Sequence, residues 1–432
     1  MRTRKPVTIF LPQKLLDELN AYLIANPPNF SIKKEYFYYI IHYLITKQIR
    51  FKKNEWNSLN LKLLKSITVT NIRRYISLLI KGEFLISNNS YSKGNHSQKY
   101  KLNEKYIDGI TEIEIDPYSK MGDRILKKNH NKKAHYNRLE PYLKIMQSEL
   151  INMELDYNNA YIWAESCPDD AKKLSYLTSI NQIEDKRFRY FKRNSTNKRL
   201  DTNLTNLKSD LRQYIIGDYV SIDNKNSQPF LLGILIDNII NKRDTLCCYL
   251  QEENYIKIFG VKGIKSVLLI HQNQEKVEMV KFRMFYDSVL NGNLYDDFIH
   301  RYTGDINRED VKQIMFKVLF SKNVCYSMYN KFIPYEDDKK VFTSVYSFVG
   351  EIIKALKVKD HSALPIYLQR IESYLFIDCI SKELVNNGII PFTIHDSVIV
   401  KTKDQKRTID IMDRVFMKQI GVIPAYNITN IN

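Results

Sequence analysis

The sequence predicts an α+β protein with a mainly helical N-terminal region and a C-terminal half built around a few short buried strands. Two apolar, strand-like runs, 219–223 and 391–400, each carry an aspartate where the strand ends. Between them, residues 307–323 repeat charged and aromatic side chains every four positions, which is the spacing of one helix face. The first 117 residues read instead as short helices followed by two strands, so we place a domain boundary after them.

Residues 57–102 have the order helix, turn, helix and two short strands around a Gly-containing loop. This order resembles a winged helix-turn-helix, with residues 68–82 as the recognition helix. The resemblance implies that basic side chains meet DNA phosphates, namely Arg73, Arg74 and Lys81 on the helix and Lys93, His96 and Lys99 in the wing. The alternative is a small helical cap whose charges are only solvated.

The segments on either side of this motif are less specific. Residues 5–23 and 31–48 read as a strand-like run and two amphipathic helices. They could form a ribbon-helix-helix dimerisation arm, but we favour ordinary packing against the winged helix. Residues 118–135 are dense in Lys, Arg and His and show no apolar face, so we expect a basic linker that could follow phosphates, before a helical stretch at 136–190.

The stretch PFTIHDSVIV, residues 391–400, predicts a hairpin that presents Asp396 at its turn. Asp223 ends the strand at 219–223 and precedes an apolar helix whose first turn contains Pro229. Two aspartates on adjacent strand ends could hold two Mg²⁺ ions for phosphoryl or nucleotidyl transfer. Alone the pair is weak, since aspartate is also a common turn former.

The helix predicted at 307–323 places Arg308, Lys312, Phe316 and Phe320 along one face. Such a face could bind a triphosphate through its cations while the rings lie against base and sugar. The alternative is an amphipathic helix with a solvated basic end and a core-facing aromatic end.

The order of these three segments resembles motifs A (219–232), B (307–323) and C (391–400) of the family A DNA polymerases and the related single-subunit phage-type RNA polymerases. The resemblance covers roughly residues 195–430. It implies a right-hand fold, with a thumb-like helical region at 136–195 and palm and fingers at 196–432.

The resemblance also implies roles for individual residues. Asp223, Asp396 and the backbone carbonyl of Asn224 would hold two Mg²⁺ ions, or Mn²⁺ in their place. Lys312 would contact the phosphates and protonate the leaving group, with Arg308, Phe316, Phe320 and Gln228 binding the nucleotide. The primer and template would be contacted by His395, Gln369, Arg199 and Asn206.

Three departures from the family pattern concern the sugar. Gln228 stands where the DNA enzymes have Glu and the RNA enzymes have Gly. Phe320 and Ser321 replace a Tyr-Gly pair, so one phenolic hydroxyl is missing. Motif C ends in Ser397, as in the RNA enzymes. We favour a DNA polymerase because of Phe316 and of Gln228, which is bulky. An RNA polymerase or primase, and a non-catalytic replication initiator or regulator, stay open.

Composition agrees with a polyanionic partner. The formal charge of +18, from 66 Lys and Arg against 48 Asp and Glu, predicts attraction to polyanions through phosphate contacts. The resemblance implies that these partners are a DNA template-primer and nucleoside triphosphates. Five cysteines without CxxC spacing argue against a disulfide framework or a zinc site, and a reducing cytoplasm is expected. We expect no membrane span, P-loop or exonuclease, and a role in replicating a plasmid, phage or other mobile element; the oligomeric state is left open.

Overall fold

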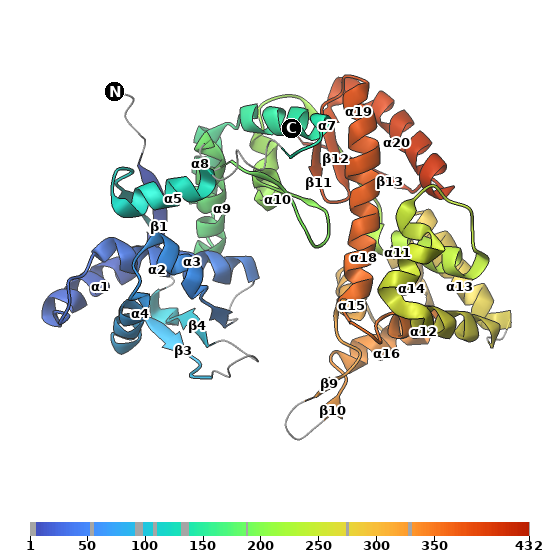
Figure 1. Cartoon of the computed structure of the whole chain (residues 1–432), viewed down its shortest axis with the longest axis horizontal. Helices are drawn as coiled ribbons and strands as arrows, with labels where there is room; N and C mark the ends of the chain where they lie inside the picture. Colours follow the sequence, from blue (N-terminus) through green and yellow to red (C-terminus); the bar gives the residue numbers. More distant parts are fainter. Residues whose placement is uncertain are drawn as a thin grey trace. The chain divides into compact units, whose positions relative to one another are not determined.

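The computed structural model describes residues 6–51, 56–90, 98–106, 110–130, 138–186, 189–273, 276–326 and 331–431. The chain forms two compact units and passes between them repeatedly (Figure 1). Unit 1 comprises residues 1–139, 151–190 and 202–216, and unit 2 comprises residues 140–150, 191–201 and 217–432. The mixture of helices and small sheets confirms the α+β class, while the division into palm, fingers and thumb stays a prediction.

Unit 1 begins with a strand that pairs within the chain. β1 (Val7–Pro12) runs antiparallel to β5 (Ile110–Ile115), with Val7 opposite Ile115. Helix α1 (Gln13–Ala25) buries leucines at four-residue spacing, and α2 (Lys34–Phe51) packs against β1 and α4 (Ile72–Lys81). The N-terminal strand therefore has its partner in the same chain, which agrees with ordinary packing rather than with a dimerisation arm.

The described part of the segment expected to be a winged helix, residues 57–90 and 98–102, contains two helices and three strands. α3 (Leu61–Ile67) and α4 (Ile72–Lys81) are followed by β3 (Leu85–Ser87) and β4 (Lys99–Leu102). β2 (Asn57–Ser58) joins them in a sheet of order β2-β4-β3. α4 buries Ile72, Tyr75, Ile76 and Leu79, the spacing of one helix face, so its basic residues are left on the opposite face.

The structure corrects the expectation of a basic linker at 118–135. Residues Lys120–His130 form helix α5, which buries Met121, Ile125 and Leu126 and packs against α3. These three side chains lie at i, i+4 and i+5, so an apolar face exists between the basic residues. The expectation of a segment without an apolar face is therefore wrong for 120–130, and residues 131–137 lie outside the described part of the chain.

The remaining elements of unit 1 come from segments further along the chain. The helical region expected at 136–195 is divided between the two units. α7 (Pro141–Asn152) belongs mainly to unit 2, whereas α8 (Tyr157–Glu165) and α9 (Asp170–Glu184) belong to unit 1. The further elements are η1 (Glu104–Tyr106), α8 (Tyr157–Glu165), α9 (Asp170–Glu184), α10 (Asn203–Asn206) and η3 (Ser209–Tyr214).

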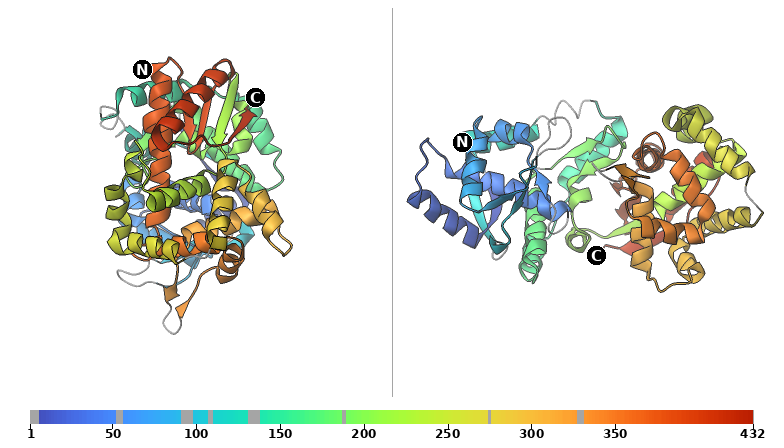
Figure 2. Two further views of the ribbon diagram at one scale, coloured as in Figure 1. Left: turned by 90° about the vertical axis from the view of Figure 1, so that its right-hand side faces the viewer. Right: turned by 90° about the horizontal axis from the view of Figure 1, so that it is seen from below.

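Unit 2 is organised around an antiparallel sheet of order β11-β12-β8-β13. Its strands are β8 (Tyr219–Asn224), β11 (Phe392–Ile394), β12 (Ser397–Lys401) and β13 (Tyr426–Asn430). The left view of Figure 2 shows the yellow-green strand β8 beside the red strands from the end of the chain. Because side chains alternate along a strand, Val220 and Ile222 enter the core while Ser221 and Asp223 take the other face.

The central helix of unit 2 is α11 (Ser227–Asn241), which directly follows β8 and packs against α12, α13 and α18. It is apolar nearly all round, as expected of a helix enclosed by others. The helices around it are α12 (Glu252–Gln272), α13 (Lys276–Leu290), α14 (Leu294–Arg301), α15 (Arg308–Phe320), α16 (Glu336–Val345), α17 (Ser347–Leu356) and α18 (Ala363–Ser373).

The last part of unit 2 supports the sheet. α18 continues through a π-helical stretch, η5 (Tyr374–Ser381), into α19 (Lys382–Asn386), and α20 (Gln405–Ile420) packs against η5. The short elements are the paired strands β6 (Phe191–Arg193) and β7 (Leu200–Thr202), the paired strands β9 (Cys325–Tyr326) and β10 (Lys331–Phe332), and η4 (Cys248–Leu250) and η6 (Thr402–Asp404).

Candidate active site

The sheet of unit 2 brings the two predicted aspartates to one end of its two central strands, β8 and β12. Asp223 is paired with Ser397 across β8 and β12, and Asp396 immediately precedes Ser397. The backbone N–H of Asn224 donates to the carbonyl oxygen of Asp396 at 3.1 Å, which fixes the turn against the end of β8. The hydroxyls of Ser221 and Ser397 are 2.6 Å apart on the face that carries Asp223. Residues far apart in the sequence thus form one carboxylate pair.

The turn that presents Asp396 has an unusual backbone. His395 and Asp396 are the two residues between the paired Ile394 and Ser397, and His395 has a φ of +56°. A positive φ is uncommon for a residue with a side chain and costs on the order of 1 kcal/mol or more. Such strain is frequent at functional positions, and here it turns an exposed His395 side chain outward beside Asp396.

The electrostatic environment of Asp396 favours its neutral form. Burial, together with the nearby carboxylates of Glu372 and Asp223, raises the pKa of Asp396 to about 7. A site in which carboxylates repel one another gains from a bound cation, because the cation offsets the repulsion. The residues therefore fit the predicted Mg²⁺ site in their charge and oxygen donors.

The structure also limits what the site itself supplies. Among the described residues, no cluster of three or more His, Cys, Asp or Glu side chains is arranged to hold a metal ion. Mg²⁺ keeps several waters and takes few carboxylates, so two aspartates with substrate phosphates remain a sufficient set. Strand alternation places the buried side chain of Asn224 on the core face, so the ligand predicted for this residue is its backbone carbonyl alone.

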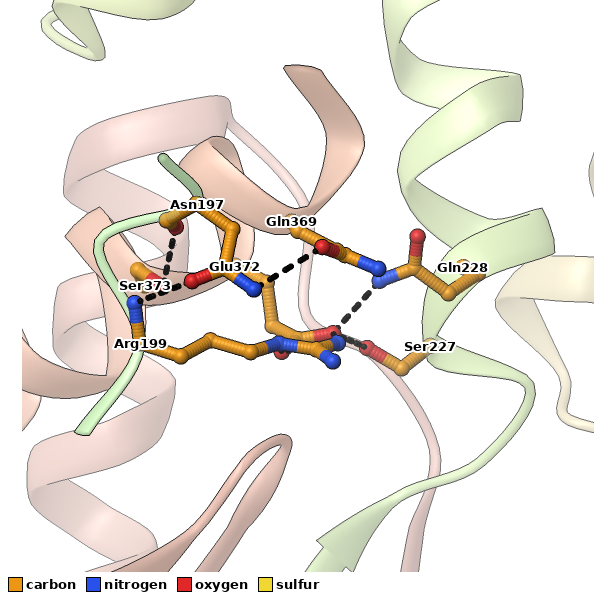
Figure 3. Close-up of polar contacts among 7 residues, drawn as sticks. All are labelled: Asn197, Arg199, Ser227, Gln228, Gln369, Glu372 and Ser373. Carbon is orange, nitrogen blue, oxygen red and sulfur yellow. Dashed lines mark hydrogen bonds and ion pairs between the residues drawn. The ribbon is translucent and has the colours of Figure 1, made fainter. Parts of the chain in front are cut away.

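Glu372 is a residue of the site that the sequence analysis missed. It is 1% exposed and accepts hydrogen bonds from Arg199 Nε at 2.7 Å and Nη2 at 2.8 Å (Figure 3). Gln228 Nε2 donates to it at 2.5 Å and Ser227 Oγ at 3.4 Å. Its burial raises the pKa of the Glu372 carboxyl, and the Arg199 guanidinium acts in the opposite direction.

A second layer of contacts attaches the loop before β7 to α18. Asn197 Nδ2 donates to Gln369 Oε1 at 3.1 Å, and Ser373 Oγ donates to the Asn197 carbonyl at 3.0 Å (Figure 3). Arg370 Nε donates to the Thr196 carbonyl at 2.7 Å. Arg199, Gln228 and Gln369, which the sequence analysis assigned to separate roles, thus belong to one polar network around Glu372.

Asn206, the fourth residue expected at the primer and template, lies in unit 1. Its side-chain amide donates to the hydroxyl of Tyr190, and the residue is exposed. The structure therefore does not bring Asn206 into the network around Glu372.

Helix α15 presents the predicted cationic and aromatic face to solvent. It begins with a capping box, in which Asn307 and Asp310 bond each other's backbone, and buries Val311, Met315 and Val318 on the opposite side. The Phe316 ring is 61% exposed and stacks on Phe320, with ring centroids 4.5 Å apart. The alternative of a core-facing aromatic end is therefore wrong for Phe316, while Phe320 packs against the core edge.

The two cations of this face have weak local partners. Arg308 forms a half-exposed ion pair with Asp296 at 2.8 Å, and Lys312 lies 3.5 Å from Glu309. Exposed pairs of this kind contribute little, so both side chains can exchange their partners for phosphate oxygens. The Tyr295 ring lies 5.5 Å from the Arg308 guanidinium. Burial raises the pKa of Tyr295, the Arg308 charge lowers it, and the charge of Asp396 raises it. Tyr295 therefore lies beside the start of α15.

The predicted DNA-contacting residues of unit 1 occupy the solvent side of its small sheet and helix pair. Arg73, Arg74, Lys81 and Lys99 are all exposed, and Arg74 lies over the Phe30 ring at 5.5 Å. Lys93 and His96 lie outside the described residues. DNA contact by this surface stays a prediction.

None of the described helices is both long enough and apolar enough to span a bilayer.

Comparison with known proteins identifies no family for this chain. No protein-family model matches the chain, and no curated protein matches it. Among solved structures, the chain is similar to the POL domain of Pol1 from M. smegmatis, determined in complex with DNA primer-template and dNTP. The identity is 11% and the TM-score 0.26, over 71% of this chain and 66% of that one, so the match spans just under two thirds of that domain. A TM-score this low establishes no common fold, and the functional argument therefore depends on the site residues themselves.

Proposed function

We propose that this chain is a template-directed nucleotidyltransferase, a small DNA polymerase of the family A type that uses two Mg²⁺ ions. The observation that carries the proposal is the pair Asp223 and Asp396 at adjacent strand ends, fixed by the 3.1 Å hydrogen bond from Asn224 N–H to the Asp396 carbonyl. The exposed cations and rings of α15, in the same unit, supply what a nucleoside triphosphate needs.

Each group has a role in this proposal. Asp223, Asp396 and the Asn224 carbonyl would hold the metal ions, which when bound would activate the primer hydroxyl and neutralise charge on the triphosphate. Arg308 and Lys312 bind the triphosphate oxygens, and Lys312 delivers a proton to the pyrophosphate as it leaves. Phe316, stacked on Phe320, offers a flat apolar surface to the base.

The sugar, the template and the biological setting are finer parts of the proposal. Gln228 occupies the first turn of α11, five positions after Asp223, and its size favours deoxynucleotides. Arg73, Lys81 and Lys99 in unit 1 would retain the protein on duplex DNA, as suits replication of a plasmid, phage or other mobile element.

The test is extension of a labelled primer on DNA and RNA templates in Mg²⁺, with deoxynucleotides and ribonucleotides offered separately. Asp223→Ala and Asp396→Ala should each abolish extension. Asp218→Ala, at an exposed residue just before the opposite end of β8, is the matched control and should extend as the wild type does. Extension that survives in both site variants would refute the proposal.

A second function is favoured by the exposed basic residues of α4. If the wild type extends no primer on either template but binds duplex DNA tightly, the chain is a non-catalytic initiator or regulator instead.

A further inference from the structure

The polar network around Glu372 is difficult to explain as a device for stability alone. Glu372 and Arg199 form a buried ion pair, with exposed side-chain fractions of 1% and 16%. Replacing such a pair with apolar residues is often neutral or stabilising, because the pair must first be removed from water. The buried charge of Glu372 therefore indicates a role in arranging the groups around it.

The neighbour most affected is Gln228. An ionised carboxylate only accepts hydrogen bonds, so the Gln228 side chain must direct its NH₂ group, and not its carbonyl, toward Glu372. In Figure 3 the Gln228 carbonyl oxygen points away from Glu372. That oxygen, Oε1, is buried and has no hydrogen-bond partner among the described residues. Glu372 thus fixes both the rotamer and the amide orientation of Gln228.

The network is itself held rigidly. Glu372 receives two bonds from Arg199, whose loop is tied to α18 through Asn197, Gln369 and Ser373. Ser227 adds a contact from the first residue of α11. A group held by three separate segments of unit 2 can position a side chain to a fraction of an ångström, as selection between closely similar substrates requires.

We propose that Glu372 is a positioning residue for sugar selection, which holds Gln228 in the single orientation that distinguishes deoxynucleotides from ribonucleotides. This inference rests on the proposed polymerase function. Glu372 contacts Gln228 and Arg199 rather than the nucleotide, so it acts through Gln228.

The test compares single-nucleotide incorporation by the full chain with each sugar. In Glu372→Gln the side-chain volume is kept, but the new amide can donate as well as accept, and Gln228 is released. The ratio of kcat/KM between the two sugars should move toward one by about tenfold, since one charge-assisted hydrogen bond is lost. Gln228→Ala should lose the same selectivity.

The double variant distinguishes a positioning role of Glu372 from a general disturbance of the fold. Glu372→Gln combined with Gln228→Ala should be no less selective than Gln228→Ala alone, because both changes remove one and the same interaction. Glu383→Gln, a half-buried carboxylate in the following helix α19, is the matched control and should keep the wild-type ratio. If Glu372→Gln does not fold, Glu372→Asp keeps the charge for Arg199 while withdrawing it from Gln228, and should show the same loss of selectivity.

The outcomes are distinguishable. If the wild type incorporates nucleotides and the Glu372 variants lower kcat/KM equally for both sugars, Glu372 is only structural and this inference is overturned while the proposed function stands. If the wild type incorporates neither sugar, the proposed function and this inference both fail.

Discussion

Replacing Asp396 with asparagine should stabilise the metal-free protein while removing its activity. Burial and the carboxylates of Glu372 and Asp223 raise the pKa of Asp396 from 3.8 to about 7. The unfolded chain releases this proton near pH 4, whereas the folded chain keeps it until about pH 7. Between these values the folded state binds more protons, so the free energy of unfolding falls as pH rises, and the full penalty applies above pH 7.

The size of the effect follows from the same shift. At about 1.36 kcal/mol per pKa unit, the penalty reaches about 4 kcal/mol at pH 8 and only about 1.5 kcal/mol at pH 5. Asparagine has nearly the same shape and no charge to lose. Asp396→Asn should therefore raise the free energy of unfolding of unit 2 by about 2.5 kcal/mol more at pH 8 than at pH 5.

The assay has to report on unit 2. Both tryptophans, Trp56 and Trp163, lie in unit 1, so tryptophan fluorescence does not report on the aspartate sheet. Hydrogen exchange of the backbone amides of β8 and β12, in metal-free buffer at the two pH values, measures the opening free energy of the sheet directly. Asp218→Asn, at an exposed residue just before β8, is the control and should change neither value.

If Asp396→Asn raised the free energy of unfolding equally at both pH values, or at neither, the reasoning would be refuted. The charge on Asp396 would then not be the source of the lost stability. Mg²⁺ at pH 8 should protect the wild-type amides and leave those of Asp396→Asn unchanged.

Other expected outcomes follow from residues outside the aspartate pair. Burial lowers the pKa of His42 to about 4, so as pH falls from 6.5 toward 4 the unfolded state takes up a proton that the folded state does not bind. The free energy of unfolding of unit 1 should therefore fall by about 3 kcal/mol over this range, as measured by tryptophan fluorescence. His42→Gln should remove that fall. Lys312→Ala should lower kcat/KM in primer extension by about a hundredfold without a change in melting temperature, while Lys340→Ala, an exposed lysine on α16, should leave both unchanged. Phe316→Ala should raise the KM for nucleotide about tenfold, because a stacking surface is lost, with little effect on stability. Arg73→Ala should weaken duplex binding and reduce the slope of log affinity against log salt by about one.

The sequence predicted the aspartate pair because its signals are local. A strand that ends in Asp223 and a hairpin that turns at Asp396 can each be recognised within ten residues, and antiparallel pairing of the two strands then brings the carboxylates together. The same holds for α15, where four-residue spacing alone places Arg308 and Phe316 on one face.

Glu372 was missed because its partners are distant. Arg199 lies 173 residues away in the sequence, and nothing local pairs an acidic residue with it. A signal was present nonetheless, since Leu364, Leu368, Glu372 and Phe376 recur every four residues and the three apolar members are buried. An acidic residue within an apolar helical stripe predicts a buried charge in need of a partner.

The linker prediction failed for a different reason. Lysines and arginines outnumber the apolar residues of 118–135, and composition concealed the spacing of Met121, Ile125 and Leu126. A narrow apolar stripe is enough to hold an eleven-residue helix against its neighbour, whatever the charge of its other faces.

The repeated passage of the chain between the two units limits how this protein can be divided. A fragment starting at residue 217 would retain both aspartates, α15 and Glu372, but would lose the segment 191–201 that supplies Arg199, together with residues 140–150 of α7. Glu372 would then be a buried carboxylate without its cation, which is strongly destabilising. Exchange of unit 2 between proteins by a single recombination event would therefore separate Glu372 from Arg199, so the unit has to be transferred together with residues 191–201.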